Sequence, residues 1–249
     1  MPIGKLSKKI FIEGTITTIT GLHIGSSNIG MSIGGADAVV LRNPISNKPY
    51  IPGSSLKGKM RSLIEKLEGE FEEGNNQTGP LLSKPDHFIC RIFGTVPKKL
   101  ENNRQPTSRL IVRDCELTLE SAEKLTESRD TDMPYTEVKT EVLIDRITSA
   151  ATPRQIERVP AGAVFAMKLI LNIYEGDNEN ELVQKVFEAL CLVQNDYLGG
   201  KGTRGSGEVK ISITGVKYKD KTVYESAGIW KEYQIPIPVE LKQNEIPVV

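Results

Sequence analysis

One carboxylate in this sequence stands in surroundings that suit chemistry on a bound ligand. Asp37 closes a loop, residues 21–37, that contains five glycines, among them Gly34 and Gly35 just before it. Because glycine has no side chain, backbone or ligand atoms can approach this carboxylate closely. A carboxylate so placed can hold a metal ion or accept the proton of a hydroxyl group. The alternative is an aspartate that only stabilises a turn.

A predicted helix start carries features that bind anions. Ser54 or Ser55 is positioned to cap a helix after Pro52-Gly53, and Lys57 and Arg61 follow four residues apart, on one side of that helix. Free amides, the helix dipole and two cations together favour a phosphate. A solvated basic face would have the same composition.

A second anion-binding candidate is the glycine-rich segment 199–207. Lys201 and Arg204 alternate there with five glycines, Gly199, Gly200, Gly202, Gly205 and Gly207. Backbone N–H groups of such a loop can approach phosphates closely. The alternative is a flexible connector, which needs neither the arginine nor so many glycines. Two anion sites in one chain fit a polyanion better than a mononucleotide.

Two familiar nucleotide motifs match only in spacing. Residues 53–59 follow the P-loop pattern, but Met60 stands where a hydroxyl should bind magnesium. Residues 200–205 read GxGxxG, but they follow a predicted helix and precede a strand, the reverse of the dinucleotide-binding order. His23, in the same loop as Asp37, either lies near phosphate or base or is an ordinary surface histidine.

Composition limits the classes of protein. The 249 residues carry 32 Lys plus Arg and 32 Asp plus Glu, so any nucleic-acid site must concentrate positive charge locally. Hydrophobic residues make up 38% and charged residues 26%, which is ordinary for a folded domain. No apolar run reaches the roughly 18 residues that cross a bilayer, and no signal peptide is evident, so we expect a cytoplasmic protein with no membrane partner.

The cysteines predict neither disulfides nor zinc. Cys90, Cys115 and Cys191 are odd in number and widely spaced, so we expect reduced thiols. With only His23 and His87 beside them, a structural zinc site is not expected.

The elements that must position these residues follow from hydrophobic periodicity. The elements with clear periodicity are, in order, strand 8–20, a helix from Ser54, strand 109–119, strand 163–173, helix 180–198 and a last strand, 208–218. The helix from Ser54 has apolar residues 56, 60, 63, 64 and 67 on one face. This order predicts a ferredoxin-like α+β fold, with two helices on one face of an antiparallel sheet and the other face open to a single-stranded nucleic acid.

The segments between these elements give weaker signals. Residues 86–94 are expected to form a short helix with Asp86 as its cap and Gly94 as its end, and 120–135 look irregular. Residues 136–160 are expected to extend and return on themselves. The proline-rich tail, 235–249, should run extended over the surface.

Several blocks together resemble the repeated backbone subunit of type III-A CRISPR effector complexes, the Csm complexes, within the RAMP superfamily. The resemblance spans most of the chain and is carried by GLHIGSSNIGMSIGGADAVVLRNPISNKPYIPGSSLKGKMRSLIE, CRIFG, RLIVRDCEL, DRITSAATPRQIERVPAGAVF and YLGGKGTRGSGEVKI.

The resemblance implies one RRM-like RAMP domain over residues 1–249. Its insertions would be a catalytic loop at 21–48, a helical and loop insertion at 69–108 and a protruding thumb β-hairpin at 129–157. Its partners would be a guide crRNA, a single-stranded target RNA, further copies of itself in a filament and other Csm subunits. Each thumb would displace one base pair of the guide–target duplex.

The resemblance also implies which residues form the catalytic site and which contact RNA. Asp37 is the expected catalytic residue, and it would act with a divalent cation, Mg²⁺ or Mn²⁺, while a ribose 2′-hydroxyl attacks the adjacent phosphate. Residues expected on RNA are His23, Ser54, Ser55, Lys57, Arg61, Arg146, Gly199, Gly200, Lys201, Gly202, Arg204 and Gly205. The alternatives are a purely structural guide-holding scaffold and a metal-independent endonuclease that processes precursor RNA with His23 as general base.

Overall fold

The computed structural model describes residues 4–25, 38–70, 84, 86–95, 108–128, 131–226 and 228–243. Asp37 and most of its loop lie outside these residues, as do most of the expected loops at 69–83 and 97–108. In the part of the chain that is described, no helix is long and apolar enough to cross a membrane.

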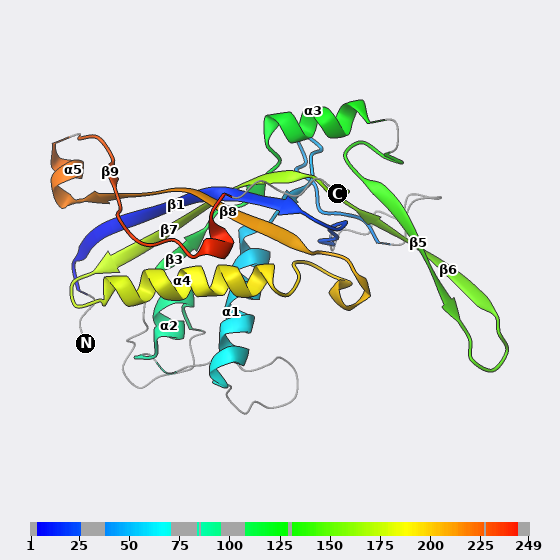
Figure 1. Cartoon of the computed structure of the whole chain (residues 1–249), viewed down its shortest axis with the longest axis horizontal. Helices are drawn as coiled ribbons and strands as arrows, with labels where there is room; N and C mark the ends of the chain where they lie inside the picture. The colour runs from blue at the N-terminus through cyan, green and yellow to red at the C-terminus, as the bar shows by residue number, and fades with distance from the viewer. Residues whose placement is uncertain are drawn as a thin grey trace.

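A five-stranded antiparallel sheet forms the centre of the molecule (Figure 1). Its middle strand, β1, alternates buried and half-buried residues, and Ile10, Ile12 and Ile16 are 0% exposed on its inner face. The strands lie in the order β3 (Leu110–Val112), β7 (Val164–Tyr174), β1 (Leu6–Thr18), β8 (Val209–Asp220) and β9 (Lys231–Glu232).

Three helices cover the inner face of the sheet in Figure 1: α1 (Gly53–Glu68), α2 (Phe88–Phe93) and α4 (Glu179–Gln194). The apolar positions of α1 point at the sheet, and Leu56, Met60 and Ile64 are 0% exposed. Leu67, expected on the same face, is 55% exposed because it lies in the last turn, beyond the sheet. The strand and helix order, together with the neighbours β3-β7-β1-β8, confirms the ferredoxin-like arrangement.

Several local predictions were wrong. Neither Ser54 nor Ser55 caps α1; the N-cap is Pro52, and the amide of Gly53 donates to Asp114 Oδ1 at 2.7 Å. His87, not Asp86, caps α2, whereas Gly94 does end it. The expected strand 109–119 breaks into β3 and β4 (Cys115–Glu116), and β4 pairs with β2 (Tyr50–Ile51) in a separate ribbon.

Two more segments differ from expectation. The stretch expected to be irregular contains α3 (Leu119–Glu127), which Thr118 caps with its hydroxyl. Near the carboxyl end, β8 is followed by α5 (Lys221–Glu225) and later by a 3-10 turn, η2 (Val239–Leu241). Leu241 of that turn is 0% exposed, so part of the tail is packed rather than lying on the surface.

A β-hairpin projects from one end of the sheet (Figure 1). Its strands, β5 (Glu137–Ile144) and β6 (Ala151–Arg158), pair in continuous register from Glu137 opposite Arg158 to Ile144 opposite Ala151. Most of their outer residues are exposed, and Val142, Leu143, Ile144 and Ile147 are 55–94% exposed near the tip. The hairpin, residues 137–158, overlaps over nearly all of its length with segment 129–157, where a thumb is expected.

A buried carboxylate fixes the root of this hairpin. Glu157, at 2% exposure, accepts hydrogen bonds from Arg42 Nη2 (2.6 Å) and the Thr136 hydroxyl (2.6 Å) on one oxygen, and from the Val40 amide (2.8 Å) on the other. Its own amide donates to the carbonyl of Ala38 at 2.9 Å. Glu157 therefore joins both hairpin strands to segment 38–42.

We expect Glu157→Ala to destabilise the fold by about 3 kcal/mol, because the partner cation of a buried pair is left uncompensated. Chemical denaturation measures this loss. The matched control is Glu120→Ala, which breaks an ion pair with Lys124 whose side chains are 79% and 74% exposed. That change should cost less than about 1 kcal/mol, and equal losses in the two variants would contradict the assignment.

The same carboxylate predicts a pH dependence. Burial raises the pKa of Glu157, but the hydrogen bonds from Thr136, Arg42 and the Val40 amide, with the charge of Arg42, lower it below its ordinary value of 4.5. A lowered pKa gives stability that is present above about pH 4.5 and is lost as pH falls through the folded-state pKa. The difference in unfolding free energy between wild type and Glu157→Gln should therefore shrink on acidification below that pH. A constant difference would show that this carboxylate is not the source.

Candidate nucleic-acid interface

Three distant segments meet at the root of the hairpin. The chain leaving β1, residues 21–25, hydrogen-bonds to the glycine segment 199–207 through Gly200 N to His23 O (2.8 Å) and Gly207 N to Gly21 O (3.0 Å). It also pairs with the end of β6, where Leu22 and Val159 exchange hydrogen bonds of 2.8 Å. The structure thus brings His23 and the glycine segment together beside the hairpin.

Glycine is required where these segments touch. A side chain at Gly199 would place its Cβ 2.4 Å from the carbonyl oxygen of His23, and φ there is +76°. Substitution at this position would therefore push the two segments apart.

His23 is not a surface residue. Its ring is buried at 8% exposure, and Nδ1 lies 2.7 Å from the carbonyl oxygen of Glu157. These contacts favour a role in holding the junction together over a role as general base.

A groove of about 460 Å³ opens between the hairpin and the glycine segment. Lys201 and Arg204 form one wall of the groove. The groove is also lined by Ala38 and by residues of both hairpin strands: Glu141, Thr152, Pro153, Arg154, Gln155 and Ile156. Ala38 bridges to Ile156 as in a parallel pair. The residue before Ala38 is Asp37, so the chain enters this groove directly after the expected catalytic residue.

The groove carries two cations that differ in exposure. Arg204 donates from Nη1 to Glu141 Oε2 at 3.2 Å, and its side chain remains 59% exposed. Lys201 is half-buried with φ of +63°, at the start of a 3-10 turn, Gly202–Arg204. Gly205 and Gly207 also have positive φ, which turns the segment tightly.

An aromatic side chain fixes this turn to α1. Tyr197 falls inside the expected helix 180–198, but α4 ends before it, at Gln194. Lys59 Nζ sits 3.5 Å from its ring centroid and pairs with Asp196 at 2.9 Å. A Cβ at Gly202 would come within 2.0 Å of the same ring, so the ring packs directly on that glycine.

The cations of α1 have partners elsewhere. Lys57 Nζ donates to Ser108 Oγ and Leu110 O, each at 2.7 Å, and burial, with the nearby charge of Arg61, lowers the Lys57 pKa. Arg61, at 8% exposure, pairs with Glu65 at 2.7 Å and donates to Gly94 O. Both hold α1 to the segments around α2 and β3. Their role as RNA contacts stays a prediction, as does that of exposed Ser54.

The other expected positions are spread over the molecule. Ser55 is half-buried in the first turn of α1, and Arg146 is exposed at the hairpin tip. Within the described ranges, no three His, Cys, Asp or Glu side chains gather where they could hold a metal ion.

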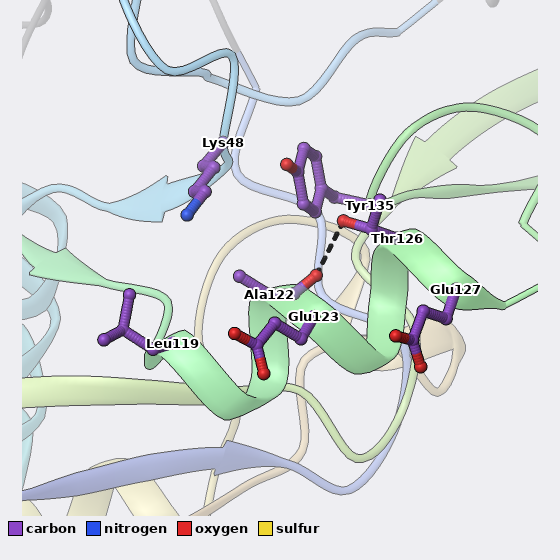
Figure 2. A pocket seen from close by; sticks show the side chains of 7 residues that line it. All are labelled: Lys48, Leu119, Ala122, Glu123, Thr126, Glu127 and Tyr135. Carbon is purple, nitrogen blue, oxygen red and sulfur yellow. Dashed lines mark hydrogen bonds between the residues drawn. The ribbon is translucent and has the colours of Figure 1, made fainter.

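A second hollow, of about 270 Å³, lies between α3 and the loop before β2 (Figure 2). Lys48 and Tyr135 face the α3 side chains Leu119, Ala122, Glu123, Thr126 and Glu127, and the Thr126 hydroxyl donates to the Ala122 carbonyl at 2.8 Å. It contains none of the expected site residues.

Sequence reasoning missed Glu157, Arg42 and the position of Tyr197. The available signal for Glu157 was an acidic residue in a strand-like segment, directly after Ile156 and two positions before Val159. Nothing in the sequence indicated its distant partner Arg42.

Comparison with known proteins gives a consistent result. A family model described as the RAMP superfamily matches residues 15–210. The CRISPR system Cms endoribonuclease Csm3 of Methanothermobacter thermautotrophicus is 40% identical over 229 residues, covering 88% of this chain and 89% of that protein. The protein of the same name from Streptococcus thermophilus is 40% identical over 225 residues, covering 87% and 96%.

A solved structure agrees. The crystal structure of a Csm3–Csm4 subcomplex in the type III-A CRISPR-Cas interference complex superposes with a TM-score of 0.57 at 28% identity, covering 92% of this chain and 90% of that one. The chain therefore belongs to the RAMP superfamily and, within it, to the Csm3 family.

Proposed function

We propose that this chain is the repeated backbone subunit of a type III-A CRISPR effector complex, which holds a guide crRNA and cuts complementary target RNA. Relatives at 40% identity over most of the chain are named endoribonucleases. The observation that carries the proposal is the groove of Lys201, Arg204 and the hairpin, which Ala38 enters directly after Asp37.

The groove suits a ribose-phosphate backbone. Lys201 and Arg204 offer cations, and the turn between them offers backbone N–H groups beside residues without side chains. Phosphate contacts of this kind fix the register of an RNA strand without reading its sequence. Sequence recognition is left to pairing between guide and target.

The proposed cut uses the target's own 2′-hydroxyl. Its oxygen bonds to the adjacent phosphorus while the bond from phosphorus to the 5′-oxygen breaks, and Asp37 accepts the hydroxyl proton. The leaving 5′-oxygen takes a proton from solvent water, and Asp37 later returns the proton it accepted to solvent, so the products are a 2′,3′-cyclic phosphate and a 5′-hydroxyl end. The hairpin supplies the geometry, because a nucleotide displaced from the duplex can align its 2′-oxygen with the breaking bond.

A divalent cation, Mg²⁺ or Mn²⁺, belongs to the proposal and would stabilise charge on the phosphate. Asp37 is the protein ligand we assign to it. Since the described residues form no group of three metal-binding side chains, water and RNA oxygens would complete its shell.

The assembly is proposed on the same basis. Copies of this chain would line one guide as a filament beside other Csm subunits, with each hairpin setting one displaced nucleotide. Cys90, Cys115 and Cys191 form no disulfide within the described residues, which supports a reducing, cytoplasmic location.

Asp37→Ala should abolish cutting while leaving assembly and target affinity unchanged, because a single carboxylate carries the proton transfer. Gel analysis of labelled target with the reconstituted complex measures cutting and target affinity. Chelation of the metal ion with EDTA should abolish cutting by the wild-type complex as well. Undiminished cutting by Asp37→Ala would support the scaffold reading. Cutting of precursor RNA by the isolated chain in EDTA would support the processing endonuclease.

Lys201→Gln combined with Arg204→Gln should weaken RNA binding and lower its salt dependence. Each phosphate contact contributes about 0.7 to the log–log salt slope on a single strand, so the slope should fall by about 1.4. Lys124→Gln, on exposed α3, removes a charge away from the groove and serves as the control. An unchanged slope for the double variant would exclude the groove as the phosphate contact.

Replacing residues 142–153 by Asn-Gly, which closes a two-residue turn between the paired residues Glu141 and Arg154, should remove the regular spacing of cuts. Thr136 and Glu157 remain, so the melting temperature should change little. Fragment lengths on a long target report the spacing. Regular fragments from this variant would assign base displacement to another segment.

A further inference from the structure

The outer face of the sheet carries a second cluster of cations and aromatic rings, far from the hairpin. It lies near α5 and β9, at the end of the sheet opposite the hairpin in Figure 1. Lys9 stands nine residues before Thr18 on β1, so this cluster is about 30 Å along the strand from the groove end.

Two lysines face each other directly there. Lys9 on β1 pairs in register with Lys219 on β8, so the two side chains leave the same face of adjacent strands. That face is the outer one, because Ile10 beside Lys9 is fully buried against the helices. Like charges directly opposite each other destabilise a sheet. Neither lysine has an acidic partner within 4.0 Å among the described residues.

A row of polar groups extends across the sheet from this pair. Asn172 on β7 is the other register partner of Lys9, and it is 7% exposed. Its Oδ1 is buried without a hydrogen-bond partner among the described residues. An unsatisfied buried carbonyl is costly, and because this oxygen is closed to solvent it adds polarity to the row without offering a contact to a ligand.

The chain's single tryptophan completes the cluster. Trp230 packs edge-on against Phe11 with ring centroids 4.4 Å apart, and Lys219 Nζ sits 4.1 Å from the centroid of its ring. The tryptophan remains 41% exposed, and nearby Tyr224 is 52% exposed. Packing of β9 on the sheet accounts for the Phe11 contact, but not for Lys219 against an exposed ring with Lys9 directly opposite it in the sheet.

We propose that this face, centred on Lys9, Lys219 and Trp230, is a second binding site for single-stranded RNA. The lysines contact phosphates, and Trp230 stacks on a base. Stacking platforms with interleaved cations bind single strands without sequence preference. The site goes beyond the proposed function, since it holds RNA away from the groove where cutting is assigned.

The single tryptophan gives a direct test. Adding a short oligouridine RNA to the purified full-length chain should quench Trp230 fluorescence, in a salt-dependent manner. Lys9→Gln with Lys219→Gln should lower the salt slope of this binding by about 1.4. The same pair of changes should leave the melting temperature nearly unchanged, because the variant removes both the repulsion between the lysines and the contact of Lys219 with the Trp230 ring. Loss of stability along with binding would contradict the site.

The matched control is Lys221→Gln on α5, which removes a charge paired with Glu225 outside the row. Trp230→Ala, followed by anisotropy of labelled RNA, should weaken binding about 5- to 150-fold, as expected for one stacked base. Absence of quenching, or quenching that the double lysine variant does not weaken, would overturn the proposal. Asp37→Ala should quench like wild type, so loss of its cutting bears only on the proposed function.

Discussion

The buried carboxylate of Glu157 is the constraint on which the rest of this molecule depends. Removing a charge from water is costly, and here the cost is offset by Arg42, Thr136 and the Val40 amide together. Arg42 and Val40 lie more than a hundred residues before Glu157 in the chain, and Thr136 lies 21 residues before it. One side chain therefore decides how the hairpin leaves the sheet and where the chain after Asp37 runs.

The contacts around Glu157 also determine where the proposed RNA-binding groove lies. Segments 21–25, 38–42 and 199–207 have little regular structure of their own, and each is held by backbone hydrogen bonds to the hairpin root or to one another. Loops positioned in this way by a rigid sheet are common places for binding and catalysis. The long strands β1, β7 and β8 then separate this groove from the cluster around Trp230 by a fixed length.

The sequence correctly predicted the strands and helices whose apolar residues recur with a regular period. Alternating Ile10, Ile12 and Ile16 identified β1, and the spacing of Leu56, Met60 and Ile64 identified α1, because burial of one face sets both periods. Caps were predicted poorly: the α1 amide of Gly53 is satisfied by Asp114, a residue that local pattern cannot connect to it. The glycine segment and the hairpin region were found from composition and resemblance. Their meeting at Glu157 depends on long-range contacts that no local window contains.

The two outermost strands of the sheet are its shortest. β3 has three residues and β9 has two, whereas β1 has thirteen. A long unpaired edge strand can form main-chain hydrogen bonds with a strand of a neighbouring molecule. A short edge strand prevents such pairing. In the filament proposed above, such short edge strands would let copies of this chain stand side by side along one guide without joining into a continuous sheet.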